Sequence, residues 1–230
     1  MKKIYFFSVF VLSFLFFSCE EVIPLNLETA PPKLVIEASI VWKKGTTGSA
    51  QKIKLSTTTS FYSDTPIKVL GATVFIKNSA NTTFTFTEVP NTGEYRCSNF
   101  VPVIGENYTL TVINNGNTYT ANETLKSVAP ITNVEQNNQG GFSGKDIELK
   151  THFIDPAAET NYYLYRYTYS TQVKSNFYVD EDVFFNGNPF FSLSRNKDVK
   201  AGDRIEISHY GISKTYYNYM SILVNIAGNN

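Results

Sequence analysis

The chain has 230 residues, with 20 basic and 20 acidic side chains, and aromatic residues make up 15% of it. This length is enough for one large domain or two small ones. The balanced charge argues against the concentrated basic face of a nucleic-acid-binding protein, so no nucleic acid is expected as a partner. The abundance of Tyr, Phe, Thr and Asn favours strands that are joined by polar turns.

Residues 1–18 have the pattern of a secretory signal peptide. Two lysines near the start are followed by residues 4–17, which are apolar except for two serines. This run is shorter than the roughly 20 residues that span a bilayer, and it matches the apolar part of a signal peptide, about 7–15 residues. Ser18 provides the small residue that a lipoprotein signal peptidase requires before its cysteine. An ordinary signal peptide cut elsewhere is the alternative, but no A-x-A-like site lies nearby, so we predict cleavage before Cys19.

Acylation of Cys19 is expected to anchor the mature chain to a membrane. Several acyl chains at one N-terminus, palmitate among them, give stable anchoring, since each buried CH₂ contributes about 0.8 kcal/mol. Residues 19–32 then form an acylated tether, because two glutamates follow the cysteine and three prolines discourage a helix. The lipid therefore makes the membrane the first predicted partner of this chain.

Residues 33–127 are expected to form a β-sandwich. Apolar side chains recur at every second position in short stretches that turn residues separate. Asn115 and Gly116 provide the positive φ angles of a tight hairpin. The alternation predicts strands over 34–40, 52–56, 72–76, 84–86, 94–97, 108–112 and 118–123. About seven short strands over this length are typical of an immunoglobulin-like or transthyretin-like sandwich.

A change in composition at 128–144 marks a boundary. The segment contains Pro130 and a polar, glycine-rich run, Asn137–Gly141, which interrupts the alternation. We interpret 128–144 as a linker between two domains or as a long crossover between two sheets.

Residues 145–230 are predicted to form a second β-domain, so the predicted fold class is mostly β with one C-terminal helix. Strands are expected over 147–153, 161–170, 177–179, 183–185 and 204–209. The helix is expected near 213–226, with Ser213 or Thr215 as its N-cap. The apolar side chains at helical spacing, which we expect to pack on the sheet, are those of Tyr216, Tyr219, Met220 and Leu223.

Four tyrosines share one face of the strand over 161–170. They are Tyr163, Tyr165, Tyr167 and Tyr169. Such a face could bind sugar rings or a partner by stacking, or it could pack beneath the C-terminal helix, and we favour packing.

An acidic run, Asp180-Glu181-Asp182, is a weak candidate for a calcium site together with Asp203. Ca²⁺ takes oxygen ligands of this type, but the run lacks the spacing of an EF-hand loop. We favour a solvated acidic loop between strands. The same carboxylates could serve a hydrolase, although the sequence does not show the cleft and the defined separation that paired catalytic carboxylates need.

The remaining metal-binding and nucleophilic residue types are few. His152 and His209 have no Cys or His partner nearby in the sequence, so they make a poor metal site. Cys97 lies in a predicted strand without a nearby histidine, which argues against a catalytic thiol. We therefore predict no catalytic residue, no metal and no cofactor, and we expect that the protein is not an enzyme.

Short pieces in a fixed order run through nearly the whole mature chain. In the first half they are Cys19 with two acidic residues, Pro32–Glu37, Ile53–Ser56, Pro66, Val69–Val74, Gly93–Tyr95, Gly105–Leu110 and Tyr119–Ala121. In the second half they are Asp155-Pro156, Asn161–Arg166, Asp180–Asp182, Phe185–Gly187, Gly202-Asp203, Tyr216 and Tyr219. Together these pieces resemble the DUF4249 lipoproteins of Bacteroidota.

The resemblance implies an outer-membrane lipoprotein that is encoded near a TonB-dependent receptor and assists it in nutrient uptake or surface assembly. The acidic pair after Cys19 is similar to the export signal of lipoproteins that are exposed on the cell surface. Family members continue past the final helix, so the resemblance implies that the domain at 145–230 is short or incomplete. The alternatives are an adhesion or glycan-binding module that uses exposed aromatics, and a hydrolase that uses Asp182.

Overall fold

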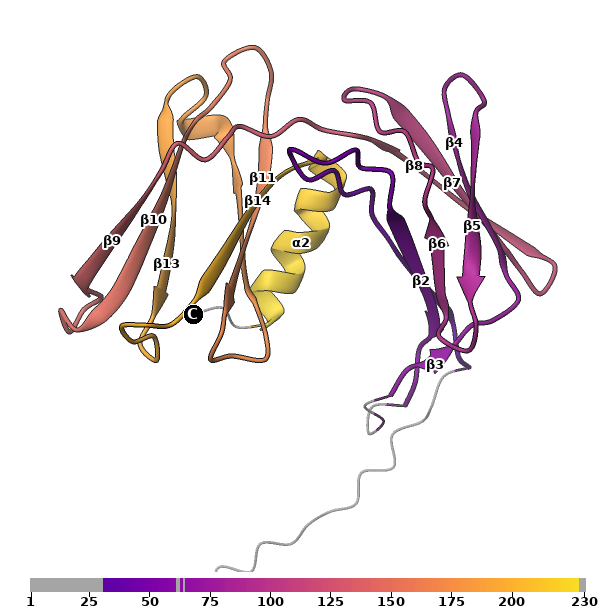
Figure 1. Ribbon diagram of the computed structural model, residues 1–230, viewed down its shortest axis with the longest axis horizontal. Helices are drawn as coiled ribbons and strands as arrows, with labels where there is room; N and C mark the ends of the chain where they lie inside the picture. Colours follow the sequence, from indigo (N-terminus) through magenta and orange to yellow (C-terminus); the bar gives the residue numbers. More distant parts are fainter. Residues whose placement is uncertain (1–30, 61–62, 64, 228–230) are drawn as a thin grey trace, which may run out of the picture.

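Two β-structures lie side by side, and one helix lies near the space between them (Figure 1). The computed structural model describes residues 31–60, 63 and 65–227, which are mostly strands and end in one α-helix, as the sequence predicts. The predicted signal at 1–18, Cys19 and most of the tether lie outside these residues. Within them, no helix has both the length and the apolar character needed to cross a bilayer.

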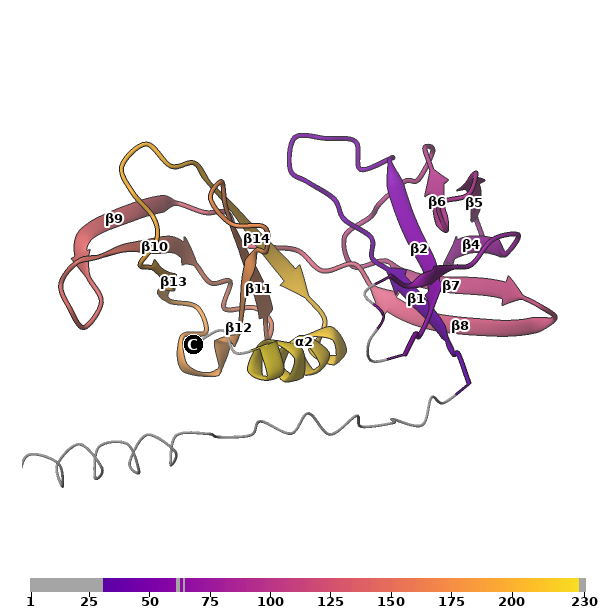
Figure 2. The same ribbon diagram turned by 90° about the horizontal axis from the view of Figure 1, so that it is seen from below.

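The described part of the N-terminal half forms one curled sheet of eight strands (Figure 2). The strands are β1 (Leu34–Ala38), β2 (Gln51–Thr57), β3 (Ile67–Lys68), β4 (Thr73–Asn78), β5 (Thr83–Val89), β6 (Glu94–Cys97), β7 (Asn107–Asn114) and β8 (Asn117–Thr124). Their order is β1-β2-β6-β5-β4-β7-β8, with β3 paired to β2. Strand β5 makes the bend, because residues 83–86 pair with β4 and residues 87–89 pair with β6. The sheet thus folds over its own core, which gives the predicted sandwich-like architecture.

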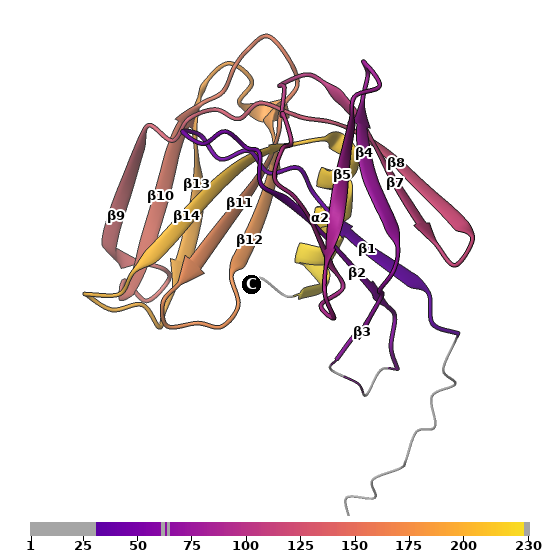
Figure 3. The same cartoon turned by 45° about the vertical axis from the view of Figure 1, so that its right-hand side comes forward.

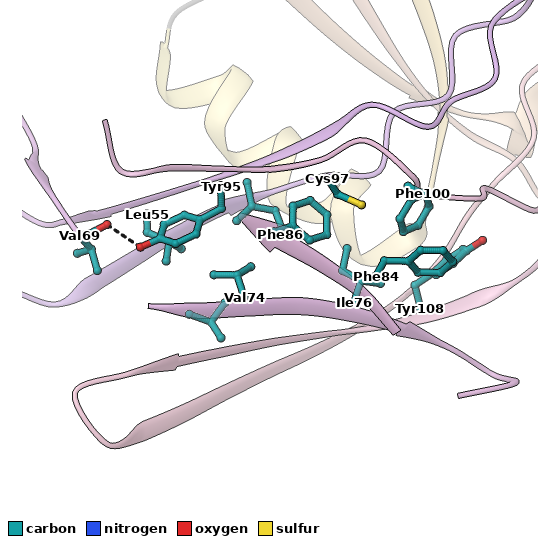
Figure 4. Close-up of a cluster of buried hydrophobic side chains, with 12 residues drawn as sticks. Leu55, Val69, Val74, Ile76, Phe84, Phe86, Tyr95, Cys97, Phe100 and Tyr108 are labelled. Carbon is teal, nitrogen blue, oxygen red and sulfur yellow. Dashed lines mark hydrogen bonds between the residues drawn. The ribbon is translucent and has the colours of Figure 1, made fainter. Parts of the chain in front are cut away.

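Alternate side chains of these strands form the core, on the faces that the sequence predicts (Figure 4). Leu55 and Val112 have no exposed surface, and aromatic rings fill the space between the two parts of the sheet. Tyr95 fixes one end of this core, since its hydroxyl donates to the carbonyl of Val69 and accepts from the amide of Ala72, both at 3.1 Å. A buried phenol with both partners in place costs little and orients the chain around it.

The C-terminal half contains two antiparallel sheets that face each other. One sheet has the order β13-β10-β9, and the other has the order β12-β11-β14. Their strands are β9 (Asn133–Gly140), β10 (Asp146–Ile154), β11 (Tyr162–Tyr169), β12 (Asn176–Glu181), β13 (Pro189–Asn196) and β14 (Ile205–Ile212). Alternate residues of β10 and β11 fill the layer between the sheets, and Thr151, Phe153 and Tyr165 are completely buried there.

Three elements of this half differ from the sequence-based expectation. Residues 133–140 form strand β9 inside the segment that we interpret as a linker. The sequence does not predict β13, whose inward residues include two serines instead of apolar side chains. The strand expected at 183–185 is wrong, since Asp182–Phe184 form a 3₁₀ turn, η2. An exposed polar edge strand and a strand with hydroxyls inward both lack the apolar alternation that reveals strands.

Helix α2 (Lys214–Ala227) begins after Ser213, which is one of the two predicted N-caps. The Oγ atom of Ser213 accepts a hydrogen bond from the amide of Tyr216 at 3.1 Å, which is an N-cap. The helix packs against β11 and β12, and Met220 is buried at that contact.

The face of α2 that packs on the sheet agrees with the predicted one at Met220 and differs from it at the other three residues. The ring of Tyr217 lies 5.2 Å from that of Tyr162 on β11, so Tyr217 takes the position expected for its neighbour Tyr216. The helix is therefore rotated, and Tyr219 and Leu223 are exposed instead of buried. Helical spacing alone identifies an apolar stripe but does not tell which of two apolar stripes faces the sheet.

The two halves approach each other at the connector and at one loop. Residues 125–132 run from β8 to β9 and pass next to β14 (Figure 1). The connection between β1 and β2 reaches toward the same strand (Figure 3). The positive charge of Lys44, a residue of that connection, contributes to lowering the pKa of His209 on β14. These contacts bring the first half against strand β14.

Candidate functional site

A cleft of about 440 Å³ lies between the two halves. The N-terminal half contributes the β1–β2 connection, β7 and β8, and the C-terminal half contributes β11, β14 and the start of α2. Its walls are mainly apolar, with Ile40 and Leu110 on one side and Leu164 and Tyr216 on the other. Its size and lining fall in the range of small-molecule and peptide sites, which is about 300–1,000 Å³.

Arg166 is the basic side chain of this cleft, and it is only partly paired. Its Nη2 atom donates to Ser208 Oγ at 3.2 Å, and its guanidinium lies 5.8 Å from the ring centroid of Tyr210. Its contact with Glu206 is long, at 3.9 Å. Its Nε atom is buried and has no hydrogen-bond partner among the described residues. An unpaired buried donor is costly, so an acceptor from a bound molecule would be favourable here.

An exposed apolar stripe on α2 continues the cleft. Tyr216 lines the cleft, and Tyr219, Leu223 and Ile226 follow at helical spacing along the outer face of the helix. Tyr219 is 55% exposed and Ile226 is 78% exposed. The sequence-based prediction assigns Tyr216, Tyr219 and Leu223 of this stripe to the core and does not include Ile226. Contiguous exposed apolar surface of this kind is typical of interaction sites.

The four candidate tyrosines of β11 belong to the core. Tyr163, Tyr165, Tyr167 and Tyr169 are each at most 2% exposed. They face the β13-β10-β9 sheet, not α2, which covers the opposite side of β11. Their rings are not available for stacking on a sugar. The prediction that these tyrosines pack in the core is therefore correct, but the C-terminal helix that we expected them to pack against is the wrong partner.

The acidic run is not the solvated loop that we favoured. Asp182 is 1% exposed, and its Oδ2 atom accepts from the amide of Asn161 at 2.7 Å. Asp180 lies in β12, and Asp203 accepts from the amide of Lys200 at 2.8 Å. In the part of the chain that the structure describes, no group of three or more His, Cys, Asp or Glu side chains is placed to hold a metal ion.

The two histidines lie in different surroundings. His152 pairs with Glu135 at 3.3 Å across two strands. His209 lies among aromatic rings and stacks on Tyr165 with 4.8 Å between centroids. Burial, and then the charge of Lys44, lowers the pKa of His209 to about 4. His209 is therefore neutral at physiological pH.

Cys97 is a core residue. It is 4% exposed, and its Sγ atom donates to Asn99 Oδ1 at 3.1 Å. A buried thiol of this kind behaves as a small apolar side chain.

A second cavity, of about 540 Å³, lies where β12, β13 and α2 meet. Asp180 lines it, and burial raises the pKa of that carboxyl to about 6. We name this space the seam cavity. Sequence reasoning misses it because β13 is not predicted, and it misses Arg166 because a single arginine in an aromatic strand gives no pattern. The signal for Arg166 is its place beside Leu164 on the face opposite the tyrosines.

A family model matches most of the chain. The model of the family described as a domain of unknown function (DUF4249) matches residues 20–230. No curated protein matches the chain.

Proposed function

Because this chain belongs to the DUF4249 family, we propose that it is a lipid-anchored outer-membrane protein that assists a TonB-dependent receptor by binding rather than by catalysis. In this proposal Cys19 carries the lipid, and the two β-structures form the part that meets the receptor or captures its ligand. The lipid anchor is inferred from the signal-peptide pattern of residues 1–18.

The observation that carries the proposal is the cleft together with the apolar stripe of α2. The cleft provides a concave apolar surface with one partly paired arginine, and the stripe extends that surface outward from Tyr216 to Ile226. Protein–protein interfaces combine an apolar centre with aromatic and arginine anchors in this way. A receptor segment with an apolar side chain for the cleft and a carboxylate for Arg166 would satisfy both surfaces.

Co-purification tests this proposal. The full chain is tagged, expressed in its own cells and recovered from outer membranes in mild detergent. We expect a TonB-dependent receptor to co-purify, and we expect Leu223→Asp, which places a charge on the stripe, to remove it. Val101→Asp is the matched control, because Val101 is exposed in the N-terminal half and does not line the cleft. Repeated recovery of the protein without any receptor would contradict the proposal.

A second candidate function is a glycan-binding surface module. The observation that favours it is a pair of exposed rings, Tyr216 and Tyr219, which stack with 6.0 Å between centroids. Adjacent exposed rings can form a platform for the apolar face of a sugar. A glycan array separates the two functions. Binding that Tyr219→Ala abolishes would support this candidate, and an array without signal at high protein concentration would count against it.

A further inference from the structure

The seam cavity lies between two strands that do not pair with each other. Strands β12 and β13 are edge strands of the two facing sheets, and α2 covers β12 from the side. The cavity has a volume of about 540 Å³ and lies apart from the cleft, with none of the residues that line it in common. Because the opening lies at the edges of the two sheets, a molecule could bind there without breaking the hydrogen bonds between strands in either sheet.

The strand registers direct a carboxylate and aromatic rings into this space. Asp180 pairs with Tyr163 across β11 and β12, so it points to the same side as that core tyrosine. Phe190 pairs with Phe153 across β10 and β13 and therefore also points inward. Tyr217 contributes a third wall from α2. The carboxylate thus faces the inner, aromatic side of this space, and Tyr217 bounds the space from the side of the helix.

The side chain of Asp180, unlike its backbone, has no protein partner in the described part of the chain. Other polar groups of this seam are already engaged, since Ser192 Oγ accepts from Tyr167 at 3.0 Å and Tyr178 lies 3.4 Å from Ser194 Oγ. No hydrogen bond or ion pair in the described residues involves the carboxylate of Asp180. The neighbouring hydroxyl of Tyr165 is buried and also lacks a partner among these residues.

The charge of the cavity is negative. Asp180 is the one ionisable acid or base among the described residues that line it, apart from tyrosines. Lys150 lies 5.2 Å from the ring centroid of Phe191, but its position in β10 alternates with the buried Thr151, so it is on the outer face of that sheet. A half-buried carboxylate without a counter-charge favours a cation, and aromatic faces attract cations as well.

We propose that the seam cavity binds a small organic cation, with an ammonium or guanidinium group held by Asp180 and by the rings of Phe190 and Tyr217. A bare divalent metal fits less well, because Ca²⁺ takes about 6–8 oxygen ligands and the cavity offers one carboxylate. The volume suits a molecule of the size of choline or agmatine. Burial raises the pKa of Asp180 to about 6, so the carboxyl is ionised at neutral pH and unfavourably solvated until a cation binds.

Calorimetric titration of the full chain in detergent tests this inference with three probes. Choline and agmatine are the cations, and 3,3-dimethyl-1-butanol is the neutral molecule with the shape of choline. We expect both cations to bind and the neutral probe to bind at least about tenfold more weakly, as a charged site requires. Absence of binding by both cations at about 10 mM, or equal binding of the neutral probe, would overturn the proposal.

Two variants and one control variant assign the binding to this cavity. Asp180→Asn keeps the shape and removes the charge, so we expect at least about tenfold weaker binding of both cations. Asp198→Asn removes an exposed carboxylate of the same half and serves as the control, with unchanged binding. Tyr217→Leu removes one aromatic wall and is expected to weaken choline binding by about threefold or more. Unchanged affinity in folded Asp180→Asn protein would overturn the assignment, whatever the receptor experiment shows.

Discussion

A Cβ atom on Gly211 would lie 1.7 Å from the carbonyl oxygen of Ser127. Strand β14 and the connector between the halves therefore touch backbone to backbone at this point. The φ angle of Gly211 is not positive, so the glycine is required by space and not by an unusual backbone conformation. Tyr210 and Ile212, on either side of it, line the cleft. The close approach at Gly211 thus determines where the first half lies relative to the cleft wall.

Gly211→Ala is expected to destabilise the protein. The added methyl group meets a backbone carbonyl that cannot move without shifting the connector, and overpacking of this kind costs about 1–3 kcal/mol. Urea denaturation gives the free energy of unfolding, and hydrogen exchange at residues 125–132 reports local loosening. Glu206→Ala is the control, because Glu206 is exposed on the same strand. A variant as stable as the wild type, with unchanged exchange, would show that the connector is not held there.

Asp180→Asn is expected to stabilise the protein at high pH. The folded-state pKa of Asp180 is raised to about 6, above the unfolded value of 3.8. The folded chain therefore binds more protons between these values, and the stability that the neutral carboxyl contributes is lost as the pH rises through 6. We expect Asp180→Asn to raise the free energy of unfolding by about 2 kcal/mol at pH 8 and by little at pH 4. A stability gain that is independent of pH would contradict this interpretation.

The contribution of His209 to stability is expected to have the opposite dependence on pH. Its folded-state pKa of about 4 lies below the unfolded value of 6.5, so the unfolded chain takes up the proton first as the pH falls. The stability that neutral His209 contributes is present above pH 6.5 and is lost as the pH falls toward 4. We expect His209→Phe to remove an acid-induced loss of about 2 kcal/mol between pH 8 and pH 4.5.

The effects of Asp180 and His209 oppose each other in the same pH range, so the wild type should show only a weak net dependence. Urea denaturation of each variant across this range separates them. Lys44→Gln tests whether the charge of Lys44 helps to lower the pKa of His209. Removing that positive charge should raise the pKa of His209 and reduce the stability that is lost in acid. Identical pH profiles for wild type and His209→Phe would exclude His209 as the source.

Tyr167→Phe is expected to destabilise the C-terminal half. The hydroxyl of Tyr167 contacts Thr151 Oγ1 at 2.9 Å and Ser192 Oγ at 3.0 Å, and its loss leaves both without this partner. A lost buried hydrogen bond costs about 1–2 kcal/mol. In a double-mutant cycle, Tyr167→Phe with Ser192→Ala should cost less than the sum of the single changes. Tyr178→Phe is the control, because its contact with Ser194 is longer, at 3.4 Å, and a large effect there would argue against this hydrogen-bond explanation.

The N-terminal half could be predicted from the sequence because its strands alternate apolar and polar residues. The inward residues of β2, such as Ile53 and Leu55, are buried as expected, and β6 has the predicted bounds. The asparagine and glycine turns at Asn91 and Asn115 adopt the positive φ angles that the residue types favour. Local pattern and local turn chemistry agree in this half, so little depends on distant contacts.

The C-terminal half could be predicted only in part, because polar residues form much of its layer. Ser192 and Ser194 face inward to meet tyrosine hydroxyls, which gives β13 no apolar alternation. The polar edge strand β9 likewise has none. The cleft and the seam cavity could not be predicted, since each combines residues from several elements whose contacts are set by the tertiary fold.

The hydroxyl contacts between the two facing sheets have a consequence for alternative pairings. Tyr167 meets Ser192, and two residues further along Tyr169 meets Ser194 at 2.6 Å. An apolar layer would tolerate sliding of one sheet over the other by a pair of residues, because any aliphatic neighbour is nearly equivalent. Here such a shift moves the outermost phenol past its serine and leaves a buried hydroxyl unpaired. These hydroxyl pairs therefore destabilise arrangements in which the sheets are shifted slightly from the native position, and they select one relative position of the sheets.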